Sequence, residues 1–261
     1  MRVSSCIDMM FGDKAFADRI ASVSKCGLDG IEFWKWTNKD INEVVDLKNK
    51  YNLGFAVFNI DSKDEKLSND LSRGILNAGR VDELLTALEE STPVYKKLNA
   101  SAMIVLVGET LPDVPHEVQV ENVYKCLKAA APIAEANDVT LVVEPLNTIE
   151  RENYFMPYAA ELMDILERVD SPNVKMLYDI YHQNVMGDFS LEFIKANIDR
   201  IGHFHVADFP GRHEPGSATV DYVSILSEIN KTNYNGYYGL EYRATKPDSE
   251  TFGFLKEINN V

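Results

Sequence analysis

Three carboxylates and one imidazole stand at the ends of four successive β-type runs in the second half of the chain. They are Glu144 after TLVV, Asp179 after VKMLY, His205 after IGHF and Glu241 after YYGL. About thirty residues separate each from the next, with a helix-length segment between, as in a chain of β–α repeats. Three oxygen donors and one nitrogen, without a thiolate, favour a divalent cation such as Mn²⁺, Mg²⁺ or Co²⁺. The residues therefore predict a metal site with two glutamates near the bound substrate.

Three of these residues also have a purely structural interpretation. Glu144, buried at a strand end, could form a salt bridge at a barrel rim, and Glu241 could pair with Arg243 or another rim cation. Asp179 could cap a helix, since aspartate is frequent at that position. The next helix, however, is expected to begin near residues 188–190, too far away for such a cap. Metal ligation is the favoured interpretation for all three.

Basic side chains surround the same strand ends. His203 precedes His205 by two residues and shares its face of the strand. We therefore expect it one layer lower, as a hydrogen-bonded core histidine or as one that supports a metal ligand. The loop PGRHEPG (210–216) carries Arg212 and His213 and follows the same strand. An ordinary solvated turn is the alternative, but a guanidinium in this place could bind a carboxylate or phosphate of the substrate.

The elements that position these residues are short apolar strands, each followed by a helix-length segment such as Lys14–Cys26. Eight such repeats without a break in composition predict a (β/α)8 TIM barrel in a single domain, residues 1–261. Its C-terminal face would gather the four strand ends. The strands are expected at Arg2–Ile7, Gly30–Trp34, Gly54–Ile60, Ala102–Val107, Thr140–Glu144, Lys175–Asp179, Gly202–Val206 and Tyr237–Glu241.

One segment interrupts this regular pattern. Asp61–Arg80 is polar and rich in Ser, Asn and Gly, and it directly follows the third strand. We expect a long loop that covers the mouth of the active site, because loops of that length in compact domains are often lids.

Composition and charge exclude several classes of protein. The chain has 26 Lys and Arg against 41 Asp and Glu, a formal charge of −15, which disfavours nucleic-acid and membrane partners. We expect neither a signal peptide nor a membrane span, since no stretch is long and apolar enough. The three cysteines are far apart and predict reduced thiols in a cytoplasmic protein. A small-molecule substrate is expected, and a homo-oligomer is left open.

The segments that carry these residues resemble the hydroxypyruvate isomerase family, within the wider xylose isomerase-like barrel group that includes the ketose 3-epimerases. The resemblance covers nearly the full length. GRHEPG and YDIYH are fairly specific to the hydroxypyruvate isomerase branch, whereas the four metal-site positions belong to the whole group. The similar segments are GLDGIEFW (27–34), LVVEPLNTIE (141–150), LYDIYHQ (177–183), IGHFHVADFPGRHEPG (201–216) and YYGLEY (237–242).

The resemblance implies a role for each candidate residue. It implies Glu144 and Glu241 as the catalytic pair that transfers protons, and His182 and Arg212 as substrate-binding residues. It also implies as metal ligands the same four strand-end residues, Glu144, Asp179, His205 and Glu241.

Two positions leave the substrate open. Some hydroxypyruvate isomerases carry Gln where this chain has His205, and histidine there is similar to the epimerases. Glu150 falls where ketose 3-epimerases hold a substrate-binding glutamate. The expected function is therefore a metal-dependent isomerase that converts hydroxypyruvate to tartronate semialdehyde, with a ketose 3-epimerase or other sugar isomerase as the alternative.

Proton transfer through an enediolate suits either reaction, because a cation beside two carboxylates stabilises the charge formed next to a carbonyl. A hydride shift is less favoured, since no lysine accompanies the proposed ligands. Three more distant alternatives are an abasic-site nuclease, a sugar-acid binding protein and a dehydratase of cyclic polyols. The nuclease would need more histidines than the five present and a basic face.

Overall fold

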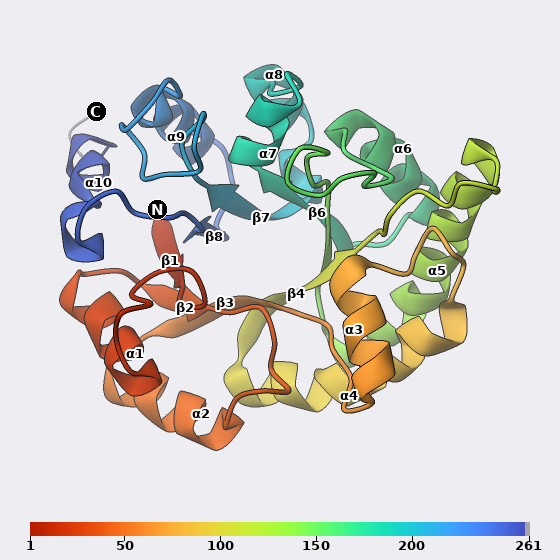
Figure 1. The fold of residues 1–261 in the computed structure, drawn as a ribbon, viewed down its shortest axis with the longest axis horizontal. Coiled ribbons are helices and arrows are strands. Elements are labelled where there is room, and N and C mark those ends of the chain that lie inside the picture. The colour runs from red at the N-terminus through yellow and green to blue at the C-terminus, as the bar shows by residue number, and fades with distance from the viewer. Residues whose placement is uncertain (259–261) are drawn as a thin grey trace.

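Eight parallel strands close into a barrel in which the order in space follows the order in the chain, and helices surround it (Figure 1). The computed structural model describes residues 1–258, so positions 259–261 of the expected domain lie outside the described residues. The expected single-domain (β/α)8 barrel is confirmed. Its strands are β1 (Arg2–Cys6), β2 (Gly30–Glu32), β3 (Gly54–Asn59), β4 (Ala100–Leu106), β5 (Leu141–Glu144), β6 (Val174–Asp179), β7 (Ile201–Val206) and β8 (Tyr237–Leu240).

The strands form because their side chains are apolar on both faces. All four residues of β5 are buried, as parallel strands require when one face packs in the barrel and the other against helices. The bounds differ from expectation by a residue or two. For example, β2 ends at Glu32, because the backbone N–H of Trp34 turns to the carboxylate of Asp8, 2.9 Å away.

The helices form an outer ring, and many begin or end at the residue types that physical chemistry favours. Asp40 accepts hydrogen bonds from two backbone N–H groups at the start of α2, and Asn99 ends α4 in the left-handed conformation. The helices are α1 (Phe16–Lys25), α2 (Ile41–Lys50), α3 (Glu65–Arg73), α4 (Val81–Leu98), α5 (His116–Asn137), α6 (Ala159–Val169), α7 (Ile180–Val185), α8 (Leu191–Ala196), α9 (Tyr222–Asn230) and α10 (Gly253–Ile258), with the short 3₁₀ turns η1 (Ile198–Arg200) and η2 (Asp248–Glu250).

The expectation of a structureless loop at Asp61–Arg80 was wrong, because α3 lies within it. Asp64 caps this helix by accepting a hydrogen bond from the N–H of Leu67, 2.8 Å away. Leu67 and Leu71, one turn apart, are its buried apolar side chains, so most of the helix surface is polar. The segment still contributes Ser72 to the rim of the central cavity.

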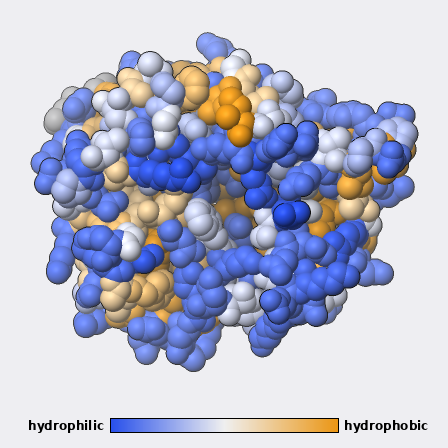
Figure 2. Space-filling model, viewed as in Figure 1, coloured by the Kyte–Doolittle hydropathy of each residue, from blue (hydrophilic) through white to orange (hydrophobic). Residues whose placement is uncertain are grey.

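The face at the carboxyl ends of the strands is hollowed. A cavity of about 720 Å³ opens there, and the space-filling view shows a mainly hydrophilic surface with a depression near its middle (Figure 2). Within residues 1–258, no helix has both the length and the apolar character needed to cross a bilayer.

Candidate active site

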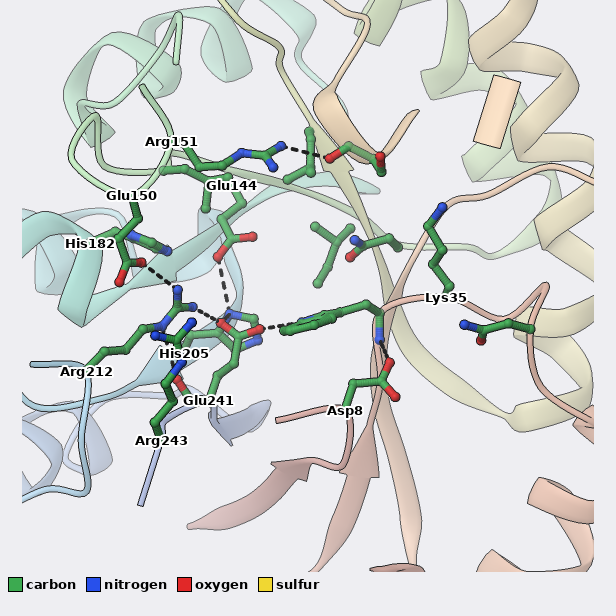
Figure 3. A pocket seen from close by; sticks show the side chains of 17 residues that line it. Asp8, Lys35, Glu144, Glu150, Arg151, His182, His205, Arg212, Glu241 and Arg243 are labelled. Carbon is green, nitrogen blue, oxygen red and sulfur yellow. Dashed lines mark hydrogen bonds and ion pairs between the residues drawn. The ribbon is translucent and has the colours of Figure 1, made fainter. Parts of the chain in front are cut away.

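The carboxyl ends of β5 to β8 bring the four predicted metal ligands together. One donor atom from each of Glu144, Asp179, His205 and Glu241 lies within 4.8 Å of the others, and all four residues are buried. Nδ1 of His205 lies 3.3 Å from Glu144 Oε1, 3.6 Å from Glu241 Oε2 and 4.0 Å from Asp179 Oδ2. Figure 3 shows Glu144 and Glu241 converging on His205 at the cavity floor. We call these four residues the ring.

The ring has more acidic than basic groups, three carboxylates and one imidazole. Burial lowers the pKa of His205, but Glu241, Glu144 and Glu32 outweigh burial and raise this pKa well above 6.5. Burial raises the pKa of Asp179, but His182, His205 and Arg212 lower it below the ordinary 3.8. Three buried carboxylates around one nitrogen are the donors that a hard or borderline divalent cation takes. By its donor chemistry and its charge, the ring fits such a cation.

Asp179 has a second contact that the sequence did not predict. It is the N-cap of α7, and its Oδ1 accepts a hydrogen bond from the N–H of His182 at 3.1 Å. The expectation that no helix was near enough to be capped was therefore wrong. The helix starts directly after β6, and its first four residues are all buried, so no amphipathic pattern marks it. Oδ2 remains directed at His205 and at His182 Nε2, 3.4 Å away.

Glu241 lies between two donors. The indole N–H of Trp34 donates to its Oε1 at 2.6 Å, and Arg212 forms an ion pair with its Oε2. The alternative considered for Glu241, a rim ion pair, is thus present, with Arg212 rather than Arg243 as partner. The other terminal nitrogen of Arg212 lies 2.7 Å from Glu150 Oε2. Burial lowers the pKa of Arg212, but Glu241, Asp179 and Glu150 raise it further above its usual value.

His182 and Glu150 line the same cavity as the ring. His182 is buried, and its Nδ1 accepts hydrogen bonds from the side-chain and backbone N–H groups of Asn147, at 2.6 and 3.3 Å. Its proton therefore sits on Nε2, the nitrogen that faces Asp179. Tyr181 donates from its hydroxyl to Glu150 Oε1 at 3.1 Å. All three residues predicted to bind substrate, His182, Arg212 and Glu150, thus lie beside the ring.

Sequence reasoning missed part of the cavity wall. Trp34 also lines it, as do Asp8, Lys35 and Arg151, which are labelled in Figure 3. Trp34 is 41% exposed, a large fraction for a tryptophan whose N–H is held by a ring carboxylate. Its position at the carboxyl end of the second strand could have identified it, because residues at such positions face the mouth of a barrel.

A second buried group lies directly beneath the ring. Glu32, at the end of β2, has its Oε1 3.1 Å from His205 Nε2 and its Oε2 3.2 Å from His203 Nε2. His203 is therefore one layer lower than His205, as its register predicted. Burial raises the pKa of Glu32, but the two histidines outweigh burial and bring this pKa to about 2. Glu32 itself was not singled out from the sequence.

The loop that carries Arg212 is held by one buried carboxylate. Asp208 follows β7 and is fully buried. Its two oxygens accept hydrogen bonds at 2.8–3.0 Å from four backbone N–H groups, those of Phe209, Gly216, Ala218 and Val220. These contacts fix the loop of residues 209–220, whose Arg212 lines the cavity, and so place the guanidinium.

We predict that Asp208→Asn lowers the free energy of unfolding by about 1–3 kcal/mol, because its amide NH₂ would face two partly buried N–H donors that a carboxylate oxygen now accepts. Urea denaturation measures the change. Asp221→Asn is the matched control, since Asp221 is an exposed N-cap of α9 and asparagine caps equally well. Equal stability of the two variants would show that Asp208 does not hold the loop.

Comparison with known proteins agrees with the fold and with an isomerase. The chain is 27% identical to the hydroxypyruvate isomerase of Escherichia coli strain K12 and 27% identical to a 2-oxo-tetronate isomerase of Cupriavidus necator. Each alignment covers 98% of this chain and 97% of the relative. The expected enzyme class is confirmed, while the names of the relatives give two different substrates.

Solved structures share the fold. A structure from Brucella melitensis described as an AP endonuclease of family 2 has a TM-score of 0.89 at 23% identity, over 98% of both chains. A D-allulose 3-epimerase from Methylomonas has a TM-score of 0.73 at 21% identity, over 98% of this chain and 90% of its own. A profile of the xylose isomerase-like TIM barrel family matches residues 20–258. The chain belongs to the xylose isomerase-like TIM barrel family.

Proposed function

We propose that this protein is a metal-dependent isomerase that moves a carbonyl along a small hydroxy-carbonyl substrate, converting hydroxypyruvate to tartronate semialdehyde. One observation carries the proposal. Two buried glutamates, Glu144 and Glu241, converge on His205 at the floor of an open cavity, within 3.3 and 3.6 Å of the same nitrogen. Full-length similarity to hydroxypyruvate isomerase and 2-oxo-tetronate isomerase supports the substrate class, a short 2-oxo acid with a neighbouring hydroxyl.

The ring residues Glu144, Asp179, His205 and Glu241 would hold the cation, with Mn²⁺, Mg²⁺ or Co²⁺ as the fitting ions. When bound, such an ion supplies positive charge that stabilises an enediolate. The solved structure of the IolI protein, at 17% identity and a TM-score of 0.73, is described with a bound zinc atom, so this scaffold accommodates a divalent ion.

The two glutamates would carry the proton. One carboxylate takes the proton from the carbon that bears the hydroxyl, which leaves an enediolate and a carboxylic acid. A carboxylic acid in the ring then gives a proton to the former carbonyl carbon, and the hydroxyl proton passes to the second oxygen. Contacts from Trp34 and Arg212 hold Glu241 in one orientation, as a proton-transfer group requires.

His182, Arg212 and Glu150 would bind the substrate. Nε2 of His182 carries a proton beside Asp179, and a guanidinium has five N–H donors, so Arg212 keeps donors for a substrate carboxylate beyond those used by Glu150 and Glu241. His182 and Arg212 would thereby hold the substrate carboxylate beside the ring, and Glu150 would accept a hydrogen bond from a substrate hydroxyl.

We predict that Arg212→Ala lowers kcat/KM for hydroxypyruvate by about 10–150-fold, the equivalent of about 1.5–3 kcal/mol for charge-assisted hydrogen bonds. The loss should be smaller for a neutral ketose, which has no carboxylate. Steady-state kinetics on both substrates measure it. Arg200→Ala is the matched control, because Arg200 lies in η1 at the opposite end of the barrel. An equal loss on both substrates would contradict carboxylate binding by Arg212.

Epimerisation of a ketose at carbon 3 is the second candidate, and Glu150 favours it. Its carboxylate lines the cavity and would repel an anionic substrate while accepting hydrogen bonds from sugar hydroxyls. A cavity of about 720 Å³ also has room for more than three carbons.

One experiment decides between the two candidates. The Mn²⁺-loaded protein is incubated in D₂O with hydroxypyruvate, 2-oxo-tetronate or a panel of ketoses, and deuterium is followed by NMR. We expect tartronate semialdehyde labelled at the carbon that receives the proton. Vigorous 3-epimerisation without turnover of either 2-oxo acid would refute the isomerase. Binding without exchange on any compound would indicate a sugar-acid binding protein instead.

A further inference from the structure

The group beneath the ring, formed by Glu32, His203 and His205, is as deeply buried as the ring itself. These three side chains are at most 2% exposed, and they come from β2 and β7. They share His205 with the ring, because its Nε2 faces Glu32 at 3.1 Å while its Nδ1 faces Glu144 at 3.3 Å. The imidazole thus lies between two carboxylates, Glu32 beside Nε2 and Glu144 beside Nδ1.

Glu32 accepts one hydrogen bond and lies beside two histidines. The hydroxyl of Ser4 donates to its Oε2 at 2.7 Å, and Nε2 atoms of His203 and His205 lie at 3.2 and 3.1 Å. Gly239 of β8 leaves the space for this group, because a Cβ at that position would lie only 2.5–2.7 Å from the carboxylate and from His203. Contacts from β1 and β7, together with the space left by Gly239 of β8, therefore keep the carboxylate beside His205.

The group beneath the ring is not a second cation site. It offers three protein donors, and a cation with so few needs water to complete its coordination. The narrow void between it and the ring has no room for a water molecule and is partly walled by Phe33, Val57 and Ile104. A buried carboxylate against the outer nitrogen of a ligating histidine is instead the arrangement that orients such histidines.

A neutral imidazole carries one proton, on either Nδ1 or Nε2, and the other nitrogen has a free lone pair. The group beside one nitrogen decides which of the two carries the proton. With a cation in the ring, the Glu32 carboxylate 3.1 Å from Nε2 would keep the single proton on that nitrogen and leave the lone pair of Nδ1 for the cation. We propose that Glu32 is a positioning residue that holds His205 in the tautomer and orientation needed to bind the cation. This inference rests on the cation site of the proposed function.

The variant Glu32→Gln tests it, because it removes the charge and keeps the shape. Titration with Mn²⁺, followed by calorimetry, should show one ion per wild-type chain and an affinity about 10–100-fold weaker in the variant. Asp29→Asn is the matched control. Asp29 directly precedes β2 and accepts a hydrogen bond from the backbone N–H of Val3, near the start of β1. The Asp29→Asn variant should therefore bind Mn²⁺ with the affinity of the wild type.

A second measurement uses the wild-type protein and so does not depend on whether the variant folds. In the Mg²⁺-loaded protein, long-range ¹H–¹⁵N spectra should place the proton of His205 on Nε2. A proton on Nδ1, an unchanged Mn²⁺ affinity in Glu32→Gln, or a second ion bound by the wild type would each overturn the positioning role while leaving the ring intact. Failure of the wild type to bind Mn²⁺ or Mg²⁺ would overturn the proposed function, and this inference with it.

Discussion

Replacement of Glu144 or Glu241 by glutamine is expected to reduce kcat by about 10²–10⁴-fold, the usual effect of removing a general base. An amide has nearly the same shape as a carboxylate but accepts no proton at neutral pH. Both residues are buried at the floor of the cavity, and each has an oxygen close to Nδ1 of His205. Turnover of hydroxypyruvate in a single-turnover assay measures the loss.

Because both glutamates are also proposed ligands, Mn²⁺ content has to be measured in each variant. Glu152→Gln is the matched control, since Glu152 is an exposed glutamate in the loop that follows β5. Near-wild-type kcat in either ring variant with Mn²⁺ bound would remove that residue from the proton-transfer pair. If a variant loses both Mn²⁺ and activity, the result supports the substituted glutamate as a metal ligand and does not test it as a proton-transfer group.

The barrel was predictable because its signal is local. Each strand is a short apolar run such as Leu141–Val143, and a parallel strand that is buried on both faces needs no more than that. Once the strands were placed, the ring followed, because residues at the carboxyl ends of successive barrel strands must meet. Spacing alone therefore brought together residues almost one hundred positions apart, Glu144 and Glu241.

The two helices that were not predicted, α3 and α7, lack a local signal for a helix in the sequence. In α3 only two apolar side chains, Leu67 and Leu71, are buried, so the segment looked like a polar loop. In α7 the reverse holds, because Ile180 and Tyr181 are buried along with their polar neighbours, and no polar face marks a helix. Periodicity identifies a helix only when one face is apolar and the other is polar.

Contacts within the site depend on tertiary structure. Arg212 meets Glu150, 62 positions earlier, and Glu241, 29 positions later, and no pattern within the chain predicts which carboxylate it selects. The same holds for Glu32 of β2, which lies beside histidines of β7, and for Trp34, which donates to Glu241 directly after β8. The sequence predicted which residue types would line the mouth, whereas the pairs among them became clear from the fold.

Removal of the cation is expected to have the second large effect. Chelation with EDTA should abolish isomerisation, and Mn²⁺, Mg²⁺ or Co²⁺ should restore it. Stability should fall as well, since the buried carboxylates of Glu144, Asp179 and Glu241 would lose the charge that offsets their repulsion. A cation present at 100 times its Kd adds about 2.7 kcal/mol to the free energy of unfolding. For a chain of this size that corresponds to a fall in Tm of about 5–10 °C on chelation.

Thermal unfolding with and without EDTA measures this fall, and the control is Asp179→Asn. Asparagine can still accept the N–H of His182 and cap α7, but it offers the ring no charge. Its Tm should therefore respond to EDTA much less than that of the wild type. If wild type and variant lose the same number of degrees, the cation stabilises the protein from another place. If the wild type keeps both its Tm and its activity in EDTA, the four residues form an ion-paired cluster, and the reaction does not depend on a metal.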